Sequence, residues 1–216
     1  MNIIKISVII PVFNQEKWIA RCLRSLINQN YNSENFEIIV INDGSDDSSE
    51  QIINKFIDDI FYIKNKANNG LPNALNQGIK ASRGNMIIRV DADDYVNENF
   101  LLYLSEFLEQ NKYMDAIACD YYLVDKNEEI ISRENCMKNP IGCGILFKSI
   151  QLFEIGLYDE EFRLNEEKDL RIRFEKKFKI HRLELPLYRY RRHENNITND
   201  KAAIDHHDEK LAKKYK

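Results

Sequence analysis

Short apolar runs alternate with helical stripes along the first 94 residues. Four runs have the length and flanking turn residues of buried strands: residues 6–11, 36–41, 60–63 and 86–90. Between them, apolar residues recur at helical spacing over 18–27, 52–57 and 71–79, and Asn14 offers an N-cap for the first helix. This alternation predicts a parallel sheet with right-handed crossovers and helices on both faces.

The rhythm changes after Asp94. The pattern predicts a helix at 99–110, a strand at 116–124, a polar segment at 125–140, a strand near 144–148, a helix near 168–178 and a strand near 181–187. Residues 202–216 indicate a charged, solvated terminal helix. We therefore expect one α/β domain with a mostly parallel central sheet over 1–200, in which 1–94 bind a nucleotide and 95–200 supply the acceptor side, followed by a helical tail at 201–216.

Composition narrows the class of protein. Of the 216 residues, 44% are hydrophobic and 31% charged, which indicates a globular chain with a real core. The net charge of −4 argues against a nucleic-acid partner. No apolar run approaches the roughly 20 residues of a membrane span, and no signal peptide is evident. Four scattered cysteines indicate reduced thiols and a cytoplasmic location, with a peripheral position at the inner face of the membrane left open.

Three polar clusters follow predicted strands: residues 11–15, 42–45 and 91–94. In open parallel sheets ligands bind at the carboxyl ends of the strands, so the shared position of these clusters predicts one binding site. Taken singly, Asp43 has a simpler interpretation as part of an Asn-Asp-Gly turn, and Phe13 as core packing.

The cluster at 91–94 has the most specific chemistry. Its three carboxylates repel one another unless a cation or hydrogen-bond donors offset their charge. Mg²⁺ and Mn²⁺ bind through such oxygen ligands together with substrate phosphates. Asp91 and Asp93 point the same way if the strand continues. The alternative is a solvated turn in which Asp94 caps the next helix.

Five blocks in order resemble the family 2 glycosyltransferases with a GT-A fold: VIIPVFN at 8–14, EIIVINDGS at 37–45, NGLPNALN at 69–76, ASRG at 81–84 and DADD at 91–94. The resemblance covers about residues 4–200. It implies a Rossmann-like nucleotide-diphosphosugar fold, an inverting transfer and a D-x-D motif that holds a divalent metal.

The resemblance also assigns roles to residues. Asp43 is expected to contact the base or ribose, Asp91 the ribose, and Asp93 the metal that bridges the donor diphosphate. The donor-binding residues that it implies are Pro11, Phe13, Asn14, Asp43, Asn73, Asp91, Ala92 and Asp93.

Later blocks at 142–147 and 156–160 are also similar to this family. Residues 166–173 read EEKDLRIR where family members usually read E-D-x-D-L-x-x-R, so the resemblance places Glu167 at the position of the catalytic aspartate. A longer side chain there implies that the backbone retreats, that a neighbour has become the base, or that the enzyme is weakened. A purely structural alternative is that acidic residues stabilise the first turn of a helix.

The segment at 188–198 resembles the closing block of the family. It adds His193 as a metal or phosphate ligand, and Arg191 or Arg192 as a cation that neutralises the diphosphate.

The sequence thus predicts a transferase that uses Mn²⁺ or Mg²⁺. It moves a sugar from a nucleotide-sugar donor, UDP being the commonest carrier in the family, to a hydroxyl of a saccharide or lipid-linked saccharide acceptor in surface polysaccharide or oligosaccharide synthesis. One alternative, a sugar nucleotidyltransferase, is expected to carry a glycine-rich loop after the first strand, and residues 11–14 contain no glycine. The other is a nucleotide-sugar-binding module whose catalytic pair has decayed. The sequence does not predict an oligomeric state.

Overall fold

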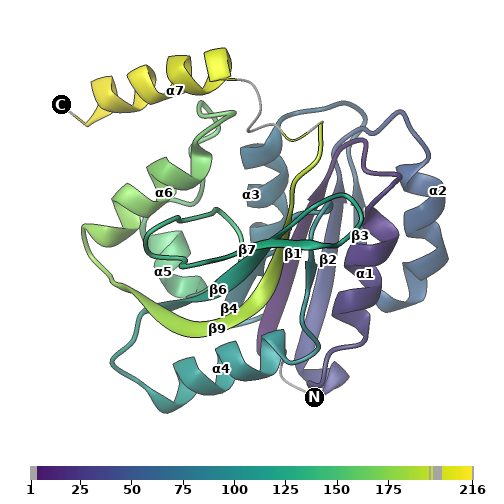
Figure 1. Cartoon of the computed structure of the whole chain (residues 1–216), viewed down its shortest axis with the longest axis horizontal. Helices are drawn as coiled ribbons and strands as arrows, with labels where there is room; N and C mark the ends of the chain where they lie inside the picture. The colour runs from purple at the N-terminus through teal and green to yellow at the C-terminus, as the bar shows by residue number, and fades with distance from the viewer. Residues whose placement is uncertain (1–3, 195, 197–200, 216) are drawn as a thin grey trace.

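The chain folds as a curved sheet between two helical layers (Figure 1). The computed structural model describes residues 4–194, 196 and 201–215, with only the backbone described at 201–206. Its elements are β1 (Ile6–Val12), α1 (Ile19–Ile27), η1 (Ser33–Asn35), β2 (Phe36–Asn42), α2 (Ser49–Ile53), η2 (Asn54–Asp59), β3 (Phe61–Lys64), α3 (Leu71–Ala81), β4 (Met86–Arg89), β5 (Tyr95–Val96), α4 (Phe100–Gln110), β6 (Ala116–Val124), β7 (Ile130–Glu134), β8 (Ile145–Lys148), α5 (Ser149–Glu154), α6 (Glu166–Glu175), β9 (Ile180–Arg191) and α7 (Lys201–Lys214).

The strand order is β3-β2-β1-β4-β8-β6-β9-β5, and β7 pairs with β6. Strands β3, β2, β1 and β4 are parallel, which confirms the prediction from the alternating pattern. Strand β8 then lies antiparallel between β4 and β6, and β6 pairs in parallel with β9. The N-terminal strands and the later strands therefore form one continuous sheet.

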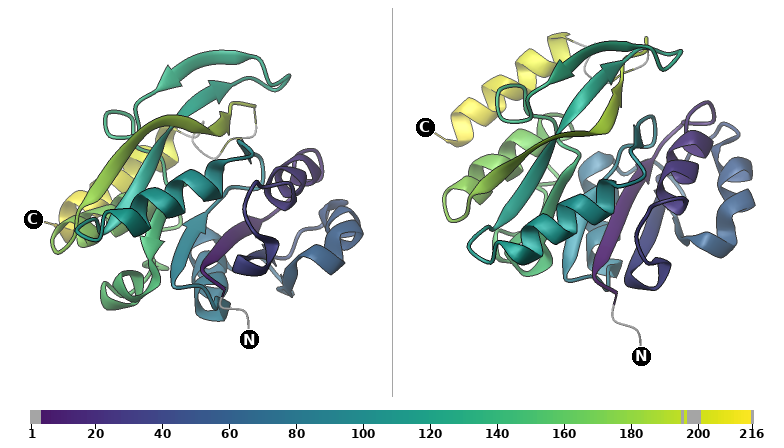
Figure 2. Two further views of the ribbon diagram at one scale, coloured as in Figure 1. Left: turned by 90° about the horizontal axis from the view of Figure 1, so that it is seen from below. Right: turned by 60° about the horizontal axis from the view of Figure 1, so that its bottom comes forward.

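Side chains of β1 alternate between two cores. Val8 and Ile10 pack with α1 and α4 on one face, whereas Ile9 packs with α3 and α6 on the other. Figure 2 shows the same division of helices between the two faces. Burial on both faces explains why these strands have continuous apolar runs instead of an alternating pattern. No helix in the described part of the chain is long and apolar enough to cross a membrane.

Several elements differ from the expectations. Asn14 is not the cap of α1, because that helix begins at Ile19 with Trp18 in the N-cap position. The polar segment at 125–140 contains the strand β7, whose Ile130 and Ile131 are exposed. The short elements β5 and α5 were also not predicted, since a strand of 2 residues shows no alternation and a helix of 6 residues has fewer than two turns.

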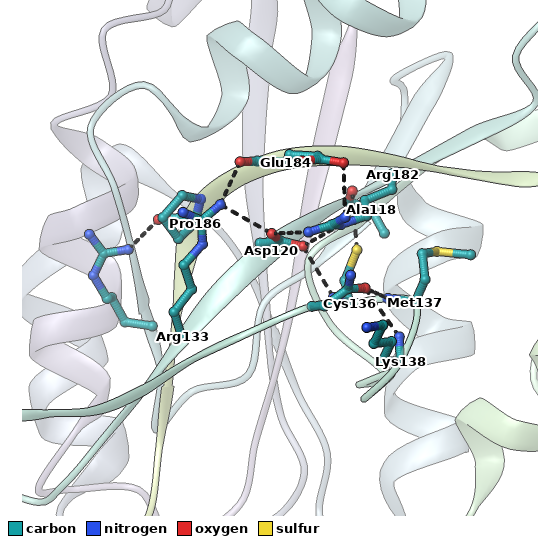
Figure 3. Close-up of polar contacts among 11 residues, drawn as sticks. Ala118, Asp120, Arg133, Cys136, Met137, Lys138, Arg182, Glu184 and Pro186 are labelled. Atoms are coloured by element: carbon teal, nitrogen blue, oxygen red, sulfur yellow. Dashed lines mark hydrogen bonds and ion pairs between the residues drawn. The ribbon is translucent and has the colours of Figure 1, made fainter.

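A buried carboxylate joins β6, β7 and β9 where the pairing of β6 with β9 shifts register (Figure 3). Asp120 is 1% exposed, and it accepts hydrogen bonds from Arg182 at 2.7 and 2.9 Å and from Arg133 at 3.3 Å. It also accepts one from the amide of Cys136, at the start of the loop that leads to Gly142. Burial acts to raise the pKa of Asp120, but these hydrogen bonds outweigh it and hold the pKa below its usual value.

We expect Asp120→Asn to lower the free energy of unfolding at pH 7 by about 1–2 kcal/mol, since the arginines that lose the anion reach solvent, which screens them. A carboxylate whose pKa is lowered by folding stabilises the protein at pH values above its pKa in the unfolded chain, which is about 4. This contribution to stability is lost as the pH falls through the pKa of the folded protein. Urea unfolding is therefore expected to give a difference between the two proteins that shrinks below about pH 4. Glu184→Gln, which alters an exposed partner of the same Arg182, is the control and should change little. A difference independent of pH would contradict this account.

Candidate active site

A cavity of about 730 Å³ lies at the carboxyl ends of β1, β2 and β4. Residues from all three polar clusters line this cavity. The shared position of the clusters after predicted strands had predicted one binding site. The other wall comes from the C-terminal half, through the loop at 140–142, the first turn of α6 and the segment after β9. Of the predicted residues, those that line the cavity are Pro11, Phe13, Asn14, Asp43, Asp91, Ala92, Asp93, Glu167 and His193.

The loop after β1 is fixed to the loop after β2. Asn14 has a φ of 53°, a left-handed conformation that asparagine tolerates. Its amide donates to Ser45 Oγ at 3.0 Å, and its side-chain oxygen accepts from the amide of Asp46 at 3.0 Å. Phe13, on the same loop, keeps 42% of its surface exposed at the cavity, so it is not a core residue.

Asp43 lies at the floor of the cavity with 3% of its surface exposed. Its carboxylate accepts hydrogen bonds from the side chain of Asn65 and from the amides of Asn69 and Gly70, just before α3. This carboxylate therefore orders the entry to α3, and its contact with a base or ribose stays a prediction.

Strand β4 ends at Arg89, so it does not continue through residues 91–93, and the condition under which Asp91 and Asp93 would point the same way is not met. Both carboxylates nevertheless line the cavity, with Ala92 between them. Asp91 receives hydrogen bonds from Arg89 at 2.6 and 3.1 Å. One oxygen of Asp93 lies 2.9 Å from Nε2 of His193.

Asp94 points into the protein. It is 2% exposed and accepts hydrogen bonds from the hydroxyl of Tyr188 at 2.7 Å and the amide of Arg191 at 2.7 Å. Burial raises its pKa well above the usual value, and the neighbouring charges of Asp93 and Asp91 raise it further. The interpretation of Asp94 as the cap of the next helix is wrong, because α4 begins at Phe100 with Asn99 as its N-cap.

The donor atoms at Asp93 suit a divalent ion. The carboxylate of Asp93 lines the cavity beside the imidazole of His193, and carboxylate oxygens are ligands that suit Mn²⁺ and Mg²⁺. A second grouping of Asp91, Asp94 and Cys143 has ligand atoms within 4.8 Å of one another. Its thiol is buried, and burial raises the pKa of Cys143, so this grouping suits a hard cation poorly.

The opposite wall carries two adjacent glutamates on the first turn of α6. Glu166 is buried and accepts a hydrogen bond from Arg89 at 2.8 Å. Burial raises the pKa of Glu166 to about 7 against the opposing charge of Arg89. Glu167 is half-buried and lines the cavity. Arg89 thus connects Asp91, which follows β4, with Glu166, the residue next to Glu167 on the opposite wall.

Gly142 leaves the space that Glu167 occupies. A Cβ atom at position 142 would lie 2.9 Å from Cβ of Glu167, closer than real Cβ atoms pack, and 3.0 Å from Nη1 of Arg89, which is a tight contact. The loop at 140–142 can therefore approach α6 only because this residue has no side chain.

Some predicted residues lie elsewhere. Asn73 is on α3 outside the cavity lining, and its amide donates to Glu160. Arg191 is 1% exposed, and it donates to the carbonyl of Asp93 and to Glu128, so it is a structural cation and not a free diphosphate ligand. Arg192 is exposed and does not line the cavity.

Three residues that the sequence reading did not select shape the site: Trp18, Arg89 and Gly142. The ring of Trp18 lines the cavity and stacks on His193 with centroids 5.5 Å apart, although its spacing had placed it in a buried stripe. Arg89 could have been noticed as a lone cation inside an apolar strand. Gly142 begins the block at 142–147 that is similar to the family, but nothing in that block indicated that it lies against residue 167.

Comparison with known proteins agrees with this geometry. Residues 7–181 match glycosyl transferase family 2, and the chain belongs to that family. It is 30% identical to the uncharacterized glycosyltransferase EpsJ of Bacillus subtilis, over 97% of this chain and 67% of that protein. It is 40% identical to the poly(ribitol-phosphate) beta-glucosyltransferase of Bacillus spizizenii, over 50% of this chain but only 18% of the relative.

Solved structures share the fold. The structure of Staphylococcus aureus TarS 1–349 in complex with UDP-GlcNAc superposes with a TM-score of 0.80 at 21% identity, covering 91% of this chain and 61% of that one. The mannosyltransferase PcManGT of Pyrobaculum calidifontis, in complex with GDP-Man and Mn²⁺, gives 0.75 at 14% identity, covering 94% and 61%. The expected GT-A fold is confirmed.

We expect Gly142→Ala to lower kcat for sugar transfer by about 10- to 100-fold, because the added methyl group displaces Glu167 by a fraction of an ångström. Nucleotide binding, measured by thermal shift, should stay close to that of the unaltered protein, since the atoms nearest to the added methyl group belong to Glu167 and Arg89 and none to residues 11–14. Unaltered turnover would show that Gly142 does not set the position of Glu167.

Proposed function

We propose that the protein is an inverting, metal-dependent glycosyltransferase that moves a sugar from a UDP-sugar to a hydroxyl of a saccharide or lipid-linked saccharide. The observation that carries the proposal is that Asp93 and Glu167, from opposite halves of the chain, line the same cavity. A metal-binding carboxylate on one wall and a proton acceptor on the other are what a displacement at a sugar carbon requires.

The donor wall holds the nucleotide and its diphosphate. Residues 11–14 offer Phe13 as an aromatic surface for the base, and Asp91 lies beside them for the ribose. Asp93 and His193 would hold a divalent ion, which when bound offsets the negative charge that grows on the departing diphosphate. Asp91 must then share its carboxylate between Arg89 and the donor.

The opposite wall handles the proton. Glu167 takes the proton of the acceptor hydroxyl while that oxygen forms a bond to the anomeric carbon. The bond from this carbon to the diphosphate breaks at the same time, so the nucleoside diphosphate leaves from the other face and the configuration inverts. A carboxylate is far too weak a base to ionise an alcohol beforehand, so proton transfer accompanies attack.

The nature of the substrates rests on analogy. TarS binds UDP and UDP-GlcNAc, and the Bacillus spizizenii relative is a poly(ribitol-phosphate) beta-glucosyltransferase. These support a UDP-sugar donor and a role in glycosylating a surface polymer. Because PcManGT binds GDP-Man, GDP-sugars should be tested beside UDP-sugars when donors are screened.

Family membership favours transfer over the sugar nucleotidyltransferase alternative. The decayed binding module is the remaining alternative, and it predicts tight nucleotide binding without turnover. Slow hydrolysis of a UDP-sugar in the presence of Mn²⁺ distinguishes the two, because an active transferase passes sugar to water at a measurable rate.

We expect Asp93→Ala to abolish the part of the UDP thermal shift that depends on Mn²⁺. Ligand binding raises the apparent thermal stability, and Mn²⁺ can add to this only if a side chain of the protein binds it. Transfer should fall by about a thousandfold or more, which corresponds to several kcal/mol of barrier. Asp46→Ala, which removes an exposed carboxylate from a neighbouring loop, is the matched control and should retain both properties. A manganese-dependent shift that survives in Asp93→Ala would remove Asp93 from this role.

Glu167→Gln is expected to lower kcat by about 10²–10⁴-fold with the donor KM unchanged, because the amide keeps the shape but cannot accept the proton. Glu167→Asp restores the residue usual in the family with a carboxylate one methylene shorter, and we expect it to retain more activity than the amide. The control is Glu175→Gln, an exposed change at the end of the same helix. Equal turnover in Glu167→Gln and Glu175→Gln would exclude Glu167 as the base.

A further inference from the structure

The C-terminal helix α7 lies across α6 instead of extending into solvent (Figure 1). Its described side chains, from residue 207 onward, contact the loop before α6 and the first turn of α6 itself. Sequence alone indicated a solvated tail, and these contacts correct that expectation.

The buried end of this contact is the carboxylate of Asp169, which is fully buried. It accepts hydrogen bonds from Nζ of Lys214 and from the hydroxyl of Tyr215, both at 2.6 Å. Its other partner, Arg173, lies on α6 at 2.8 Å. Two of the three groups that satisfy this buried anion therefore come from the last residues of the described chain.

The exposed end of the contact is Asp208. It accepts hydrogen bonds from the side chains of Asn165 at 2.9 Å and Lys168 at 2.7 Å. Lys168 and Asp208 are partly exposed, and a surface ion pair of this kind stabilises little. Their importance is positional, because Asn165 and Lys168 flank the two glutamates in sequence.

The middle of the contact is formed around the buried ring of Phe162. Phe162 is 1% exposed, and the ammonium groups of Lys210 and Lys214 lie 4.8 and 4.9 Å from the centre of its ring. Leu211 is also buried. Lys214 further donates to Asp159 at 2.7 Å. Helix α7 is thus attached along the whole stretch from Asp159 to Asp169.

That stretch includes the wall of the cavity that carries Glu167. Leu164, Asn165, Glu166 and Glu167 line the cavity, and the left-handed backbone of Asn165, with a φ of 60°, sets the direction in which α6 begins. Arg89 holds this turn from inside the cavity through Glu166, and α7 holds it from outside through Asp169 and Asp208.

We propose that α7 is a positioning element for the base, in which Lys214 and Tyr215 act through Asp169, and Asp208 acts through Asn165, to hold the first turn of α6 where Glu167 faces the acceptor. The catalytic consequence rests on the proposed function, whereas the mechanical consequence for α6 does not. Asp169, Asp208, Lys214 and Tyr215 are not among the residues that line the cavity.

The test compares the full chain with its Lys214→Met/Tyr215→Phe variant, and with Lys213→Met as the control because Lys213 is an exposed lysine on the same turn. Hydrogen–deuterium exchange of the amides of residues 163–170 reports on the turn itself. We expect about tenfold faster exchange in the double variant, with β1 still protected, and no change in the control. Tyr215→Phe alone serves if the double variant exchanges globally, and a smaller local increase is expected from it.

Kinetics supply the second measurement. We expect kcat to fall by about tenfold with the donor KM unchanged, and Lys214→Arg, which keeps the cation, to restore most of it. Exchange at 163–170 equal to that of the control would overturn the proposal. A wild-type protein that turns over no donor would instead contradict the proposed function, while the exchange measurement still decides the role of α7.

Discussion

The arrangement of the site depends on one buried cation. Arg89 is the last residue of β4, and its guanidinium donates hydrogen bonds to Asp91 on one wall of the cavity and to Glu166 on the opposite wall. Its side chain is 10% exposed and that of Glu166 is 5% exposed, so solvent screens this contact little. Removing one partner of a buried pair typically costs about 3–5 kcal/mol, because the other charge is left without compensation. If the two walls separated, Arg89 would lose either Asp91 or Glu166, and a buried charge would be left without its partner.

This constraint explains how residues from distant parts of the sequence face one cavity. Parallel strands bring the loops after β1, β2 and β4 together at one edge of the sheet. Strand β8, antiparallel to β4, then returns the chain so that the loop at 140–142 and helix α6 close the other side. Gly142 permits the loop at 140–142 to lie close to α6, and Arg89 holds Glu166 at hydrogen-bond distance. Helix α7 contacts the outer surface of the same turn of α6.

Much of the fold could be predicted from sequence because its first half is locally determined. Continuous apolar runs and helical stripes gave β1 to β4 and the helices between them, and strand ends marked Asp43, Asp91 and Asp93. Long-range pairing could not be predicted in this way. Arg89 and Glu166 lie 77 residues apart, and nothing near either residue indicates that they meet. Trp18 illustrates a different limit, since its helical spacing is correct but it precedes the first turn of α1 and its ring lines the cavity. A short edge strand such as β7, with isoleucines exposed, has a pattern that resembles a polar loop.

A crystal structure of the chain with UDP and Mn²⁺ tests the central claim most directly. The account predicts that the ion is bound at Asp93, that the nucleotide lies against residues 11–14, and that Arg89 still joins Asp91 to Glu166 with Glu167 across the cavity. A nucleotide bound outside this cavity, or an Arg89 side chain turned away from Glu166 with the ion in place, would contradict it.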